Sequence, residues 1–175
     1  PRIQYQLGRA LSKNENKKEA NKWYKRAVKH DYAAAQHNLG TNYFYGFGVS
    51  KDVQEGVKWI QRAATNGLGF SQNFLCNSYD IEDVAEPEKW CLLSANNGDS
   101  ESQSILGFLY AKGQGVPKDR KAALIWYRRA ADQGDVFAQE NLGKAYLHGL
   151  GVDKNIEEAK KWFHRAAKQG DASAQ

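Results

Sequence analysis

The sequence predicts an all-α fold built from an array of helix–turn–helix repeats, and a regular spacing carries this prediction. The five tryptophans, Trp23, Trp59, Trp90, Trp126 and Trp162, lie 36, 31, 36 and 36 residues apart. Each is followed four residues later by a small residue, and four of the five are followed eight residues later by glycine. A period in this range is typical of stacked repeats rather than of a single folded-back core.

The tryptophan of each repeat is expected to lie on a helix with recognisable ends. Seven residues before each tryptophan stands Asn or Asp, which cap helix N-termini, and in four repeats a glutamate follows the cap by three residues. The helix should bury its tryptophan and end at a glycine able to turn left-handed. The expected caps are Asn16, Asp52, Asp83, Asp119 and Asn155, and the expected terminal glycines are Gly67, Gly98, Gly134 and Gly170.

A second helical segment precedes each of these helices. It carries a glutamine, a leucine three residues later and, in four repeats, a tyrosine four residues after the leucine. Leucine and tyrosine four residues apart lie on one helical face. A small residue between them predicts close approach of two backbones. These small residues are Gly8, Gly40, Cys76, Gly107 and Gly143, and Gly-x-Gly-Val turns follow at 46–49, 113–116 and 149–152.

The combined motif resembles a known family. The pattern Ala-x-Ala-Gln-x-x-Leu-Gly-x-x-Tyr-x-x-Gly-x-Gly-Val-x-x-Asp, followed by Ala-x-x-Trp-x-x-x-Ala-Ala-x-x-Gly, is similar to the Sel-1-like repeat, a tetratricopeptide-like repeat with a longer turn. The match is close at residues 33–67, 102–134 and 138–170 and looser at 1–32 and 70–99. The resemblance implies an α-solenoid, a right-handed superhelix of about five hairpins, in a single domain over residues 1–175. The expected repeats span about 1–32, 33–69, 70–100, 101–136 and 137–171, with the start of a further repeat at 172–175.

Composition sets few limits on function. The net charge is 25 − 20 = +5, which permits attraction to acidic surfaces without requiring it. No stretch approaches the roughly 20 apolar residues of a membrane span. Because the chain starts without Met and ends in the opening of another repeat, we expect it to belong to a longer protein. Whether the longer protein carries a signal peptide therefore stays open. The resemblance favours a bacterial periplasmic or secreted location.

The two cysteines lie on facing helices of the third repeat. Cys76 takes the place of the packing glycine and Cys91 follows Trp90. A disulfide is possible. In secreted members of the resembled family that carry such a bridge, the second cysteine lies further along its helix. This difference favours two free, buried thiols that act as small hydrophobes.

The third repeat is irregular in its turn. From its small residue to its tryptophan it has 14 residues, against 19 in the regular repeats, and it lacks Gly-x-Gly-Val. Pro87 conflicts with a helix capped at Asp83, so we expect a shorter helix that begins at the proline. The turn is also the most acidic stretch of the chain and is either a clipped, solvated turn or a local contact site. Its acids are Asp80, Glu82, Asp83, Glu86 and Glu88.

Catalytic and cofactor sites are not indicated. The Gly-x-Gly-Val turns lack the third glycine and the preceding strand of a dinucleotide site. The histidines His30, His37, His148 and His164 show no zinc-ligand spacing. Arginines three residues after the tryptophans are interleaved with glutamates, which is typical of a solvated helix face. We therefore expect no enzyme activity, no cofactor, no metal and no nucleic-acid partner.

The resemblance points to the first helices as the binding surface. In tetratricopeptide-like arrays the first helix of each repeat lines a concave groove, and five positions on each helix face it. Large aromatics and basic residues at these positions resemble the anchors of protein interfaces, although some, such as Phe44 and Phe137, could pack between repeats instead. The candidate partner-binding residues are Tyr5, Arg9, Lys13, His37, Thr41, Phe44, Tyr45, Phe70, Asn73, Asn77, Phe108, Lys112, Phe137, Lys144 and His148.

The expected function is a protein–protein interaction scaffold or adaptor that binds a polypeptide in this groove. One alternative is an inhibitor of the immunity-protein type, which occludes the active site of a partner and predicts a single tight, salt-sensitive complex. Another alternative is an enzyme or ligand binder acting on envelope components. An enzyme predicts a closed pocket that holds a titrating group with a perturbed pKa.

Overall fold

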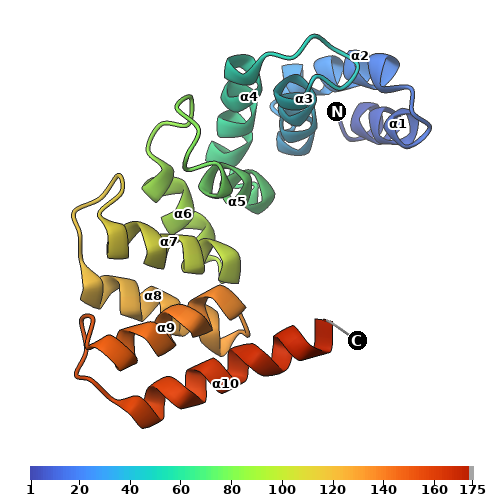
Figure 1. Cartoon of the computed structure of the whole chain (residues 1–175). Helices are drawn as coiled ribbons and strands as arrows, with labels where there is room; N and C mark the ends of the chain where they lie inside the picture. Colours follow the sequence, from blue (N-terminus) through green and yellow to red (C-terminus); the bar gives the residue numbers. More distant parts are fainter. Residues whose placement is uncertain (174–175) are drawn as a thin grey trace. The chain divides into compact units, whose positions relative to one another are not determined.

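The computed structural model describes residues 1–173, with side chains to residue 170, and this part holds ten α-helices, one 3-10 helix and no strand (Figure 1). The first helices of the repeats are α1 (Arg2–Lys13), α3 (Ala33–Tyr45), α5 (Gly69–Asn77), α7 (Ser100–Lys112) and α9 (Val136–His148). The second helices are α2 (Lys17–Ala27) with its 3-10 extension η1 (Val28–His30), α4 (Val53–Thr65), α6 (Pro87–Asn96), α8 (Arg120–Asp132) and α10 (Ile156–Ser173). The predicted all-α repeat fold is confirmed.

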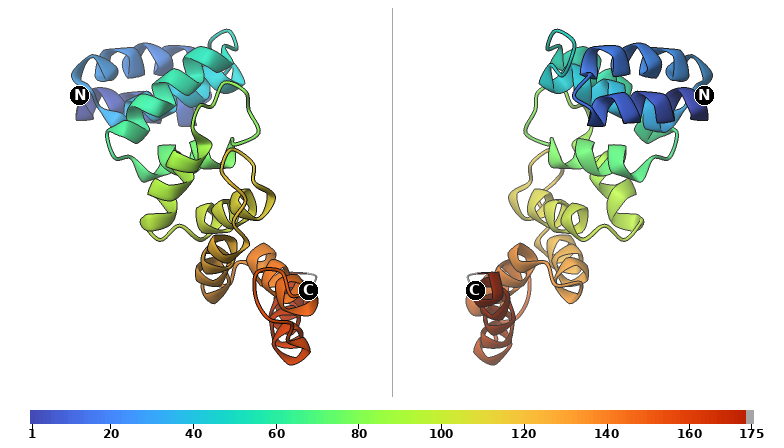
Figure 2. Two further views of the ribbon diagram at one scale, coloured as in Figure 1. Left: turned by 90° about the vertical axis from the view of Figure 1, so that its left-hand side faces the viewer. Right: turned by 90° about the vertical axis from the view of Figure 1, so that its right-hand side faces the viewer.

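The helices fall into two compact units. Unit 1 spans Pro1–Ala85 and holds α1 to α5, and unit 2 begins at Glu86 and holds α6 to α10. In both units every helix packs against the next helix in the chain. Figure 1, and Figure 2 from two further sides, show this stacking for α7 to α10. Contacts between neighbours therefore hold each unit together, as expected for a repeat array.

Four second helices begin at the predicted cap. In each, the side-chain oxygen of the cap accepts a hydrogen bond at 3.0–3.3 Å from the backbone N–H three residues later. Such a bond satisfies one of the N–H groups left without an intrahelical partner and contributes about 1 kcal/mol. The four confirmed caps are Asn16, Asp52, Asp119 and Asn155.

The third repeat departs from the others at its turn. Helix α6 begins at Pro87, and Glu86 before it adopts a left-handed backbone with φ of 53°. The helix has 10 residues, against 13 in α4 and in α8. The expected start at the proline is confirmed, and Asp83 caps no helix because the proline excludes an earlier start. Val84 is buried and anchors the turn, whereas Asp83 is exposed.

The ends of the second helices follow the glycine pattern with one exception. Three predicted glycines adopt the left-handed conformation, with φ of 82°, 92° and 96° at Gly67, Gly98 and Gly134. The prediction for Gly170 is wrong, because α10 continues through it to Ser173. Glycine permits a left-handed turn without imposing one. The further repeat predicted at 172–175 falls partly on the end of α10, and its residues 174–175 lie outside the described part of the chain.

Each regular hairpin is tightest where the glycine of its first helix meets the side chain that follows the tryptophan. A Cβ added to Gly107 would lie 2.7 Å from the Tyr127 ring, closer than real Cβ contacts come. The predicted close approach of two helices is thus confirmed, and its partner residue is identified. The equivalent pairs are Gly8 with Tyr24, Gly40 with Ile60 and Gly143 with Phe163.

The tryptophans are less uniformly buried than the sequence predicts. Trp90 and Trp162 are 5% and 2% exposed, but the other three are only half-buried. The arginine three residues later lies over the ring, for example Arg129 at 4.6 Å from the centre of Trp126. The difference follows the next residue. The half-buried tryptophans are followed by Tyr24, Ile60 and Tyr127, which are buried and face the first helix. Phe163 is itself only half-buried, and in that repeat Trp162 takes the core position.

Buried glutamines tie one repeat to the next. The side-chain amide of Gln139 donates a hydrogen bond at 3.1 Å to the carbonyl of Ala131, near the end of the preceding second helix. Its oxygen accepts a bond at 3.1 Å from Gln169, near the end of its own second helix. The Ala131 carbonyl also accepts a bond at 3.0 Å from the backbone N–H of Gly134, so the glutamine adds a second bond at a helix end whose carbonyls lack intrahelical partners. Gln72 and Gln103 donate to Ala64 and Ala95 in the same way.

Both cysteines are disulfide-bonded, and the described residues include no free cysteine. The prediction of two free thiols is therefore wrong. Cys76 occupies the position of the packing glycine in the other repeats. Cys91 occupies the position directly after the tryptophan. In the regular repeats these two positions form the tightest contact of the hairpin. Register is thus a better guide to the state of these cysteines than the spacing seen in the resembled family.

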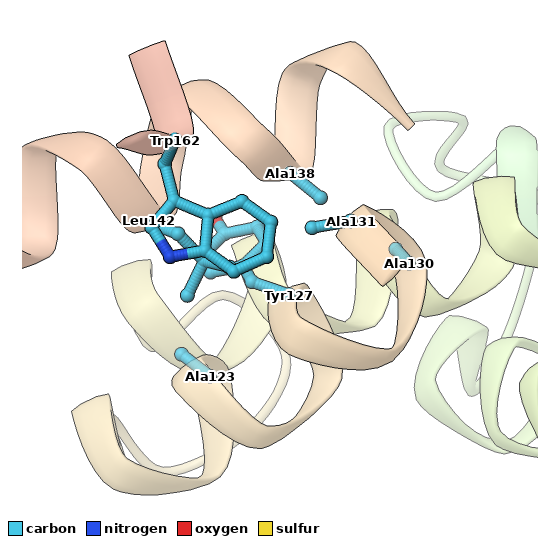
Figure 3. Close-up of a cluster of buried hydrophobic side chains, with 7 residues drawn as sticks. All are labelled: Ala123, Tyr127, Ala130, Ala131, Ala138, Leu142 and Trp162. Atoms are coloured by element: carbon cyan, nitrogen blue, oxygen red, sulfur yellow. The ribbon is translucent and has the colours of Figure 1, made fainter. Parts of the chain in front are cut away.

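Buried and half-buried tryptophans should differ in how much they contribute to the free energy of unfolding. Trp162 packs with Tyr127 and Leu142 in the core of unit 2 (Figure 3). Trp162→Ala is expected to lower the free energy of unfolding by about 3–5 kcal/mol, because it empties a buried site. Trp126→Ala is the matched control and should cost half as much or less. Urea unfolding followed by circular dichroism measures both, and equal losses would contradict this account.

Candidate functional site

The first helices of unit 1 carry a cluster of aromatic side chains on α3, α5 and the turn after α3. We call His37, Phe44, Tyr45, Phe47 and Phe74 the α3–α5 aromatic cluster. The ring of Phe44 lies 5.2 Å from that of Phe74 and 4.9 Å from that of Tyr45, both edge to face. Tyr45 also stacks on Phe47 at 5.5 Å. Such pairs contribute about 0.5–1.5 kcal/mol each, so the cluster holds its exposed members in place.

Exposure separates the members of this cluster. Tyr45 and Phe47 are 53% and 42% exposed, whereas Phe44 and Phe74 are half-buried. Phe44 therefore has a packing role in part, as the sequence analysis allows. Phe70, at the start of α5, is 80% exposed.

Histidine 37 is held inside the same cluster. Its Nδ1 lies 2.9 Å from the Ser71 hydroxyl, and its ring meets the Phe74 ring edge to face at 6.1 Å. Burial lowers the pKa of His37 below its ordinary value, because the charged form loses hydration. The imidazole is therefore neutral at pH 7 and acts as a packed polar group.

The remaining candidates of unit 1 are mostly engaged locally. Tyr5 packs on Tyr24 and Tyr32, with ring centres at 6.1 and 5.1 Å, and the Arg9 guanidinium lies 5.8 Å from the Tyr5 ring. Arg9 and Lys13 are exposed and line a small depression on α1. Thr41 donates a hydrogen bond to the Asn38 carbonyl, and the Asn77 side-chain amide donates one to Asn73.

Unit 2 contains a pocket of about 400 Å³ between α7, α8 and α9, which we call the α7–α9 pocket. Helices α7 and α9 supply its two sides, and α8 supplies its floor through Tyr127, which is 4% exposed. Two turns supply the remaining wall. The aromatic, basic and large apolar side chains that line the pocket include Phe108, Lys112, Lys118, Arg120, Tyr127, Phe137, Lys144 and Leu150.

The Gly-x-Gly-Val turns bring residues of one repeat against the previous repeat. A Cβ at Gly151 would lie 2.8 Å from the Cβ of Arg120, at the start of α8. A Cβ at Gly48 would likewise lie 2.5 Å from the backbone of Lys17. At Gly48 and Gly151 the second glycine is thus required by close contact as well as by its left-handed φ of 68° and 79°, whereas Gly115 has a φ of 74° and meets its nearest neighbour, Pro87, at 4.0 Å. This contact places Leu150 beside Arg120 at the pocket.

The α7–α9 pocket is electrostatically one-sided. Four cations line it, and none of its lining residues, all in the described part of the chain, is Asp or Glu. Lys144 is paired with Glu140 at 3.5 Å on the exposed face of α9. Burial raises the pKa of the Tyr127 phenol, so this group stays uncharged. The pocket therefore favours a negatively charged occupant.

The structure brings together four of the predicted residues in this pocket, namely Phe108, Lys112, Phe137 and Lys144. His148 is exposed and does not line it. Sequence reasoning missed Lys118, Arg120, Tyr127 and Leu150, because it considered first helices only. It also missed Phe74, which lies between the predicted Asn73 and Asn77. An aromatic at a register occupied by Asn38 and Asn141 in other repeats is the signal that could have found it.

Two classes of site are not found in the described residues. Residues 1–173 contain no group of three or more His, Cys, Asp or Glu side chains arranged to hold a metal ion. Within the same range, no helix is long and apolar enough to cross a membrane.

The family model of the Sel1 repeat matches residues 4–32, 33–68, 100–135 and 136–171. These segments correspond to four of the five hairpins and leave out residues 69–99, which hold the altered turn and both cysteines.

Solved structures of Sel1-type proteins are similar over almost the whole chain. A protective antigen of uropathogenic Escherichia coli that displays an SLR fold is 31% identical with a TM-score of 0.86, covering 95% of this chain and 38% of that one. A Sel1 repeat protein from Oxalobacter formigenes is 30% identical with a TM-score of 0.85, covering 94% of this chain and 72% of that one. A Sel1-like repeat-containing protein of Acanthamoeba polyphaga mimivirus is 32% identical over 65 residues, 37% of this chain and 13% of that protein. The chain thus spans well under half the length of the first and the last of these proteins.

The burial of His37 predicts a specific pH dependence. A histidine whose pKa is lowered in the folded state contributes stability in full above the ordinary histidine pKa, about 6.5. That contribution is lost as the pH falls from there through the folded-state pKa. Wild type is therefore expected to lose more free energy of unfolding between pH 7 and pH 5 than His37→Gln. His148→Gln, at an exposed site, is the control for removing a histidine. Identical pH dependence in wild type and His37→Gln would refute this role of His37.

Proposed function

Because the chain belongs to the Sel1 repeat family, we propose that it is a protein-interaction module that binds a polypeptide segment of a partner along its first helices. Sel1 repeats are generally scaffolds for protein interactions and are not catalytic. An array of helical hairpins offers such a partner a series of similar surfaces, one for each repeat.

The observation that carries this proposal is the exposure of large aromatic side chains on first helices. Tyr45, Phe70 and Phe137 are 53%, 80% and 48% exposed. Aromatic side chains bury much area at low entropic cost, and they are enriched at the energetic centres of interfaces. Exposed basic residues lie on other first helices, among them Arg9 and Lys13 on α1 and Lys112 on α7.

The second helices differ in their surface chemistry. Five of their lysines are paired with glutamates three residues earlier, for example Lys22 with Glu19 at 2.7 Å and Lys160 with Glu157 at 2.9 Å. The arginine three residues after the tryptophan lies over its ring in four repeats, and Arg62 also pairs with Asp31. Most of these outer charges are thus engaged locally, the start of α8 being an exception, which favours the first helices as the binding surface.

An enzymatic function has little support in the chemistry of the pocket. The titratable group on its floor is Tyr127, and burial raises the pKa of this phenol. A phenol shifted in that direction gives up its proton less readily, so it is poorly suited to acid–base catalysis near neutral pH.

The proposal is tested by affinity capture from lysate and envelope fractions, read by quantitative mass spectrometry. The test bait carries Tyr45→Ala, Phe137→Ala and Lys144→Glu, all at exposed sites of first helices. The matched control carries Ile125→Ala and Lys160→Glu, at exposed sites of second helices. The partner is expected to be depleted at least about tenfold on the test bait, because interface anchors contribute about 2 kcal/mol or more each.

Identical partner lists from the wild-type bait, the test bait and the control bait would contradict binding at the first helices. Repeating the capture at increasing salt concentration distinguishes an adaptor from an inhibitor. An adaptor should release several partners of moderate affinity, whereas an inhibitor should retain one tight partner at low salt and lose it as salt rises.

A further inference from the structure

We propose that the α7–α9 pocket binds an acidic segment of the partner, in which a carboxylate and a neighbouring apolar side chain enter together. This inference rests on the proposed function and specifies the chemistry of the partner at one site. It follows from the charge, the apolar walls and the size of the pocket.

The first argument is charge. Lys112 comes from α7, Lys118 and Arg120 from the turn and start of α8, and Lys144 from α9, so cations approach the pocket from three elements. None of the ion pairs found among the described residues involves Lys112, Lys118 or Arg120. Cations gathered without counter-charges repel one another and destabilise the free protein, so an anionic occupant would relieve a cost.

The start of α8 strengthens the positive potential. Of the second helices in the described chain, α8 is the one whose first turn holds no Asp or Glu. Ala122 stands where the other repeats carry the glutamate of the capping motif, and Arg120 and Lys121 precede it. Cations at a helix N-terminus oppose the helix dipole, and the acid that offsets them at the start of α8 is the cap, Asp119. An anion bound at the pocket would interact favourably with both the dipole and the cations.

Arginine 120 is suited to recognise a carboxylate. Asp119 caps α8 by accepting bonds from the N–H groups of Lys121 and Ala122, which fixes the backbone beside Arg120. The turn at Gly151 packs against its Cβ. The exposed guanidinium of Arg120 offers a planar fork, which binds a carboxylate through two parallel hydrogen bonds.

The second argument is the apolar half of the pocket. Phe137 and Leu150 are 48% and 37% exposed at its mouth, and Phe108 lies 6.3 Å from Phe137, ring centre to ring centre. These walls would lose unfavourable contact with water if an aliphatic or aromatic side chain covered them. A bare anion would leave them exposed, so the occupant needs an apolar group next to its charge.

The third argument is size. A pocket of about 400 Å³ lies in the range of small-ligand sites and holds a few side chains. It suits an extended peptide of two or three residues in contact. A nucleic-acid strand would instead require a longer basic track, and Lys160 and Lys161 of the nearby second helix α10 are paired with glutamates. A polypeptide is therefore favoured over a nucleic acid.

The test uses fluorescein-labelled ten-residue peptides and fluorescence anisotropy at low salt. The probe contains a central Asp-Glu-Leu-Phe segment between Gly and Ser residues. One control replaces Asp-Glu with Asn-Gln, and a second replaces Leu-Phe with Ser-Gly. The probe is expected to bind at least about tenfold more tightly than either control, because hydrogen bonds to charged groups and the burial of a large apolar side chain each contribute that much.

Variants assign the binding to this pocket. Arg120→Gln and Phe137→Ala are each expected to weaken binding of the probe about tenfold. Lys121→Gln is the matched control, because Lys121 follows Arg120 on α8, is exposed and does not line the pocket. It should change affinity less than about threefold. Circular dichroism confirms that each variant is folded.

Three outcomes would overturn the inference. The first is equal binding of the probe and the Asn-Gln control peptide. The second is an equal loss of affinity in Arg120→Gln and Lys121→Gln. The third is displacement of the probe by a single-stranded oligonucleotide at a lower concentration than by unlabelled probe. Tripolyphosphate serves as a competitor without apolar groups, and displacement at a concentration matching unlabelled probe would show that charge alone is recognised. A bait that carries Tyr45→Ala alone separates the two proposals, because Tyr45 lies in unit 1 and outside the pocket. If the inference fails while this bait still loses the partner, the proposed function stands.

Discussion

The contact between a glycine of each first helix and the large side chain after each tryptophan is the constraint on which the regular hairpins depend. No Cβ fits at Gly107, because the Tyr127 ring lies 2.7 Å from the position it would occupy. The backbone of one helix therefore rests directly on a side chain of the other. Since the same contact recurs at Gly8, Gly40 and Gly143, it sets the separation and the register of the two helices in four hairpins. Close packing of this kind responds to the addition of a single methyl group.

This packing also decides which side chains remain available for a partner. With Tyr127 turned to the first helix, the tryptophan before it lies at the edge of the hairpin, and an arginine covers its ring. The outer arginines are thereby engaged in stabilising the repeat. On α7, Phe108 and Lys112 lie one turn apart and point into the pocket that Tyr127 floors. Tyr127 therefore belongs both to the contact with Gly107 and to the α7–α9 pocket. This residue links the stability of unit 2 to the shape of its pocket.

The sequence predicts the elements well and the functional surface only in part. Caps such as Asn16 and Asp52 and terminal glycines such as Gly67 are local signals, because the groups they satisfy lie within a few residues. The depth of Trp126 and the state of Cys91 depend on which helix faces which. Periodicity therefore gave the wrong depth for Trp126, and the cysteine spacing of the resembled family gave the wrong state for Cys91. Half of the residues that define the charge and shape of the pocket come from turns and from α8. They reach the first helices through two contacts between distant residues, Tyr127 against Gly107 and Arg120 against the turn at Gly151.

The most direct test is a double-mutant cycle between Gly107 and Tyr127, with the free energy of unfolding measured in urea. Gly107→Ala should be destabilising beside Tyr127, because the new Cβ collides with the ring. In the Tyr127→Ala background the collision is gone, and the same substitution should be neutral or stabilising by up to about 1 kcal/mol, the helix propensity of alanine over glycine. The predicted coupling between the two sites is therefore above about 1 kcal/mol. Additive effects of the two substitutions would show that the glycine–ring contact does not hold the hairpin together.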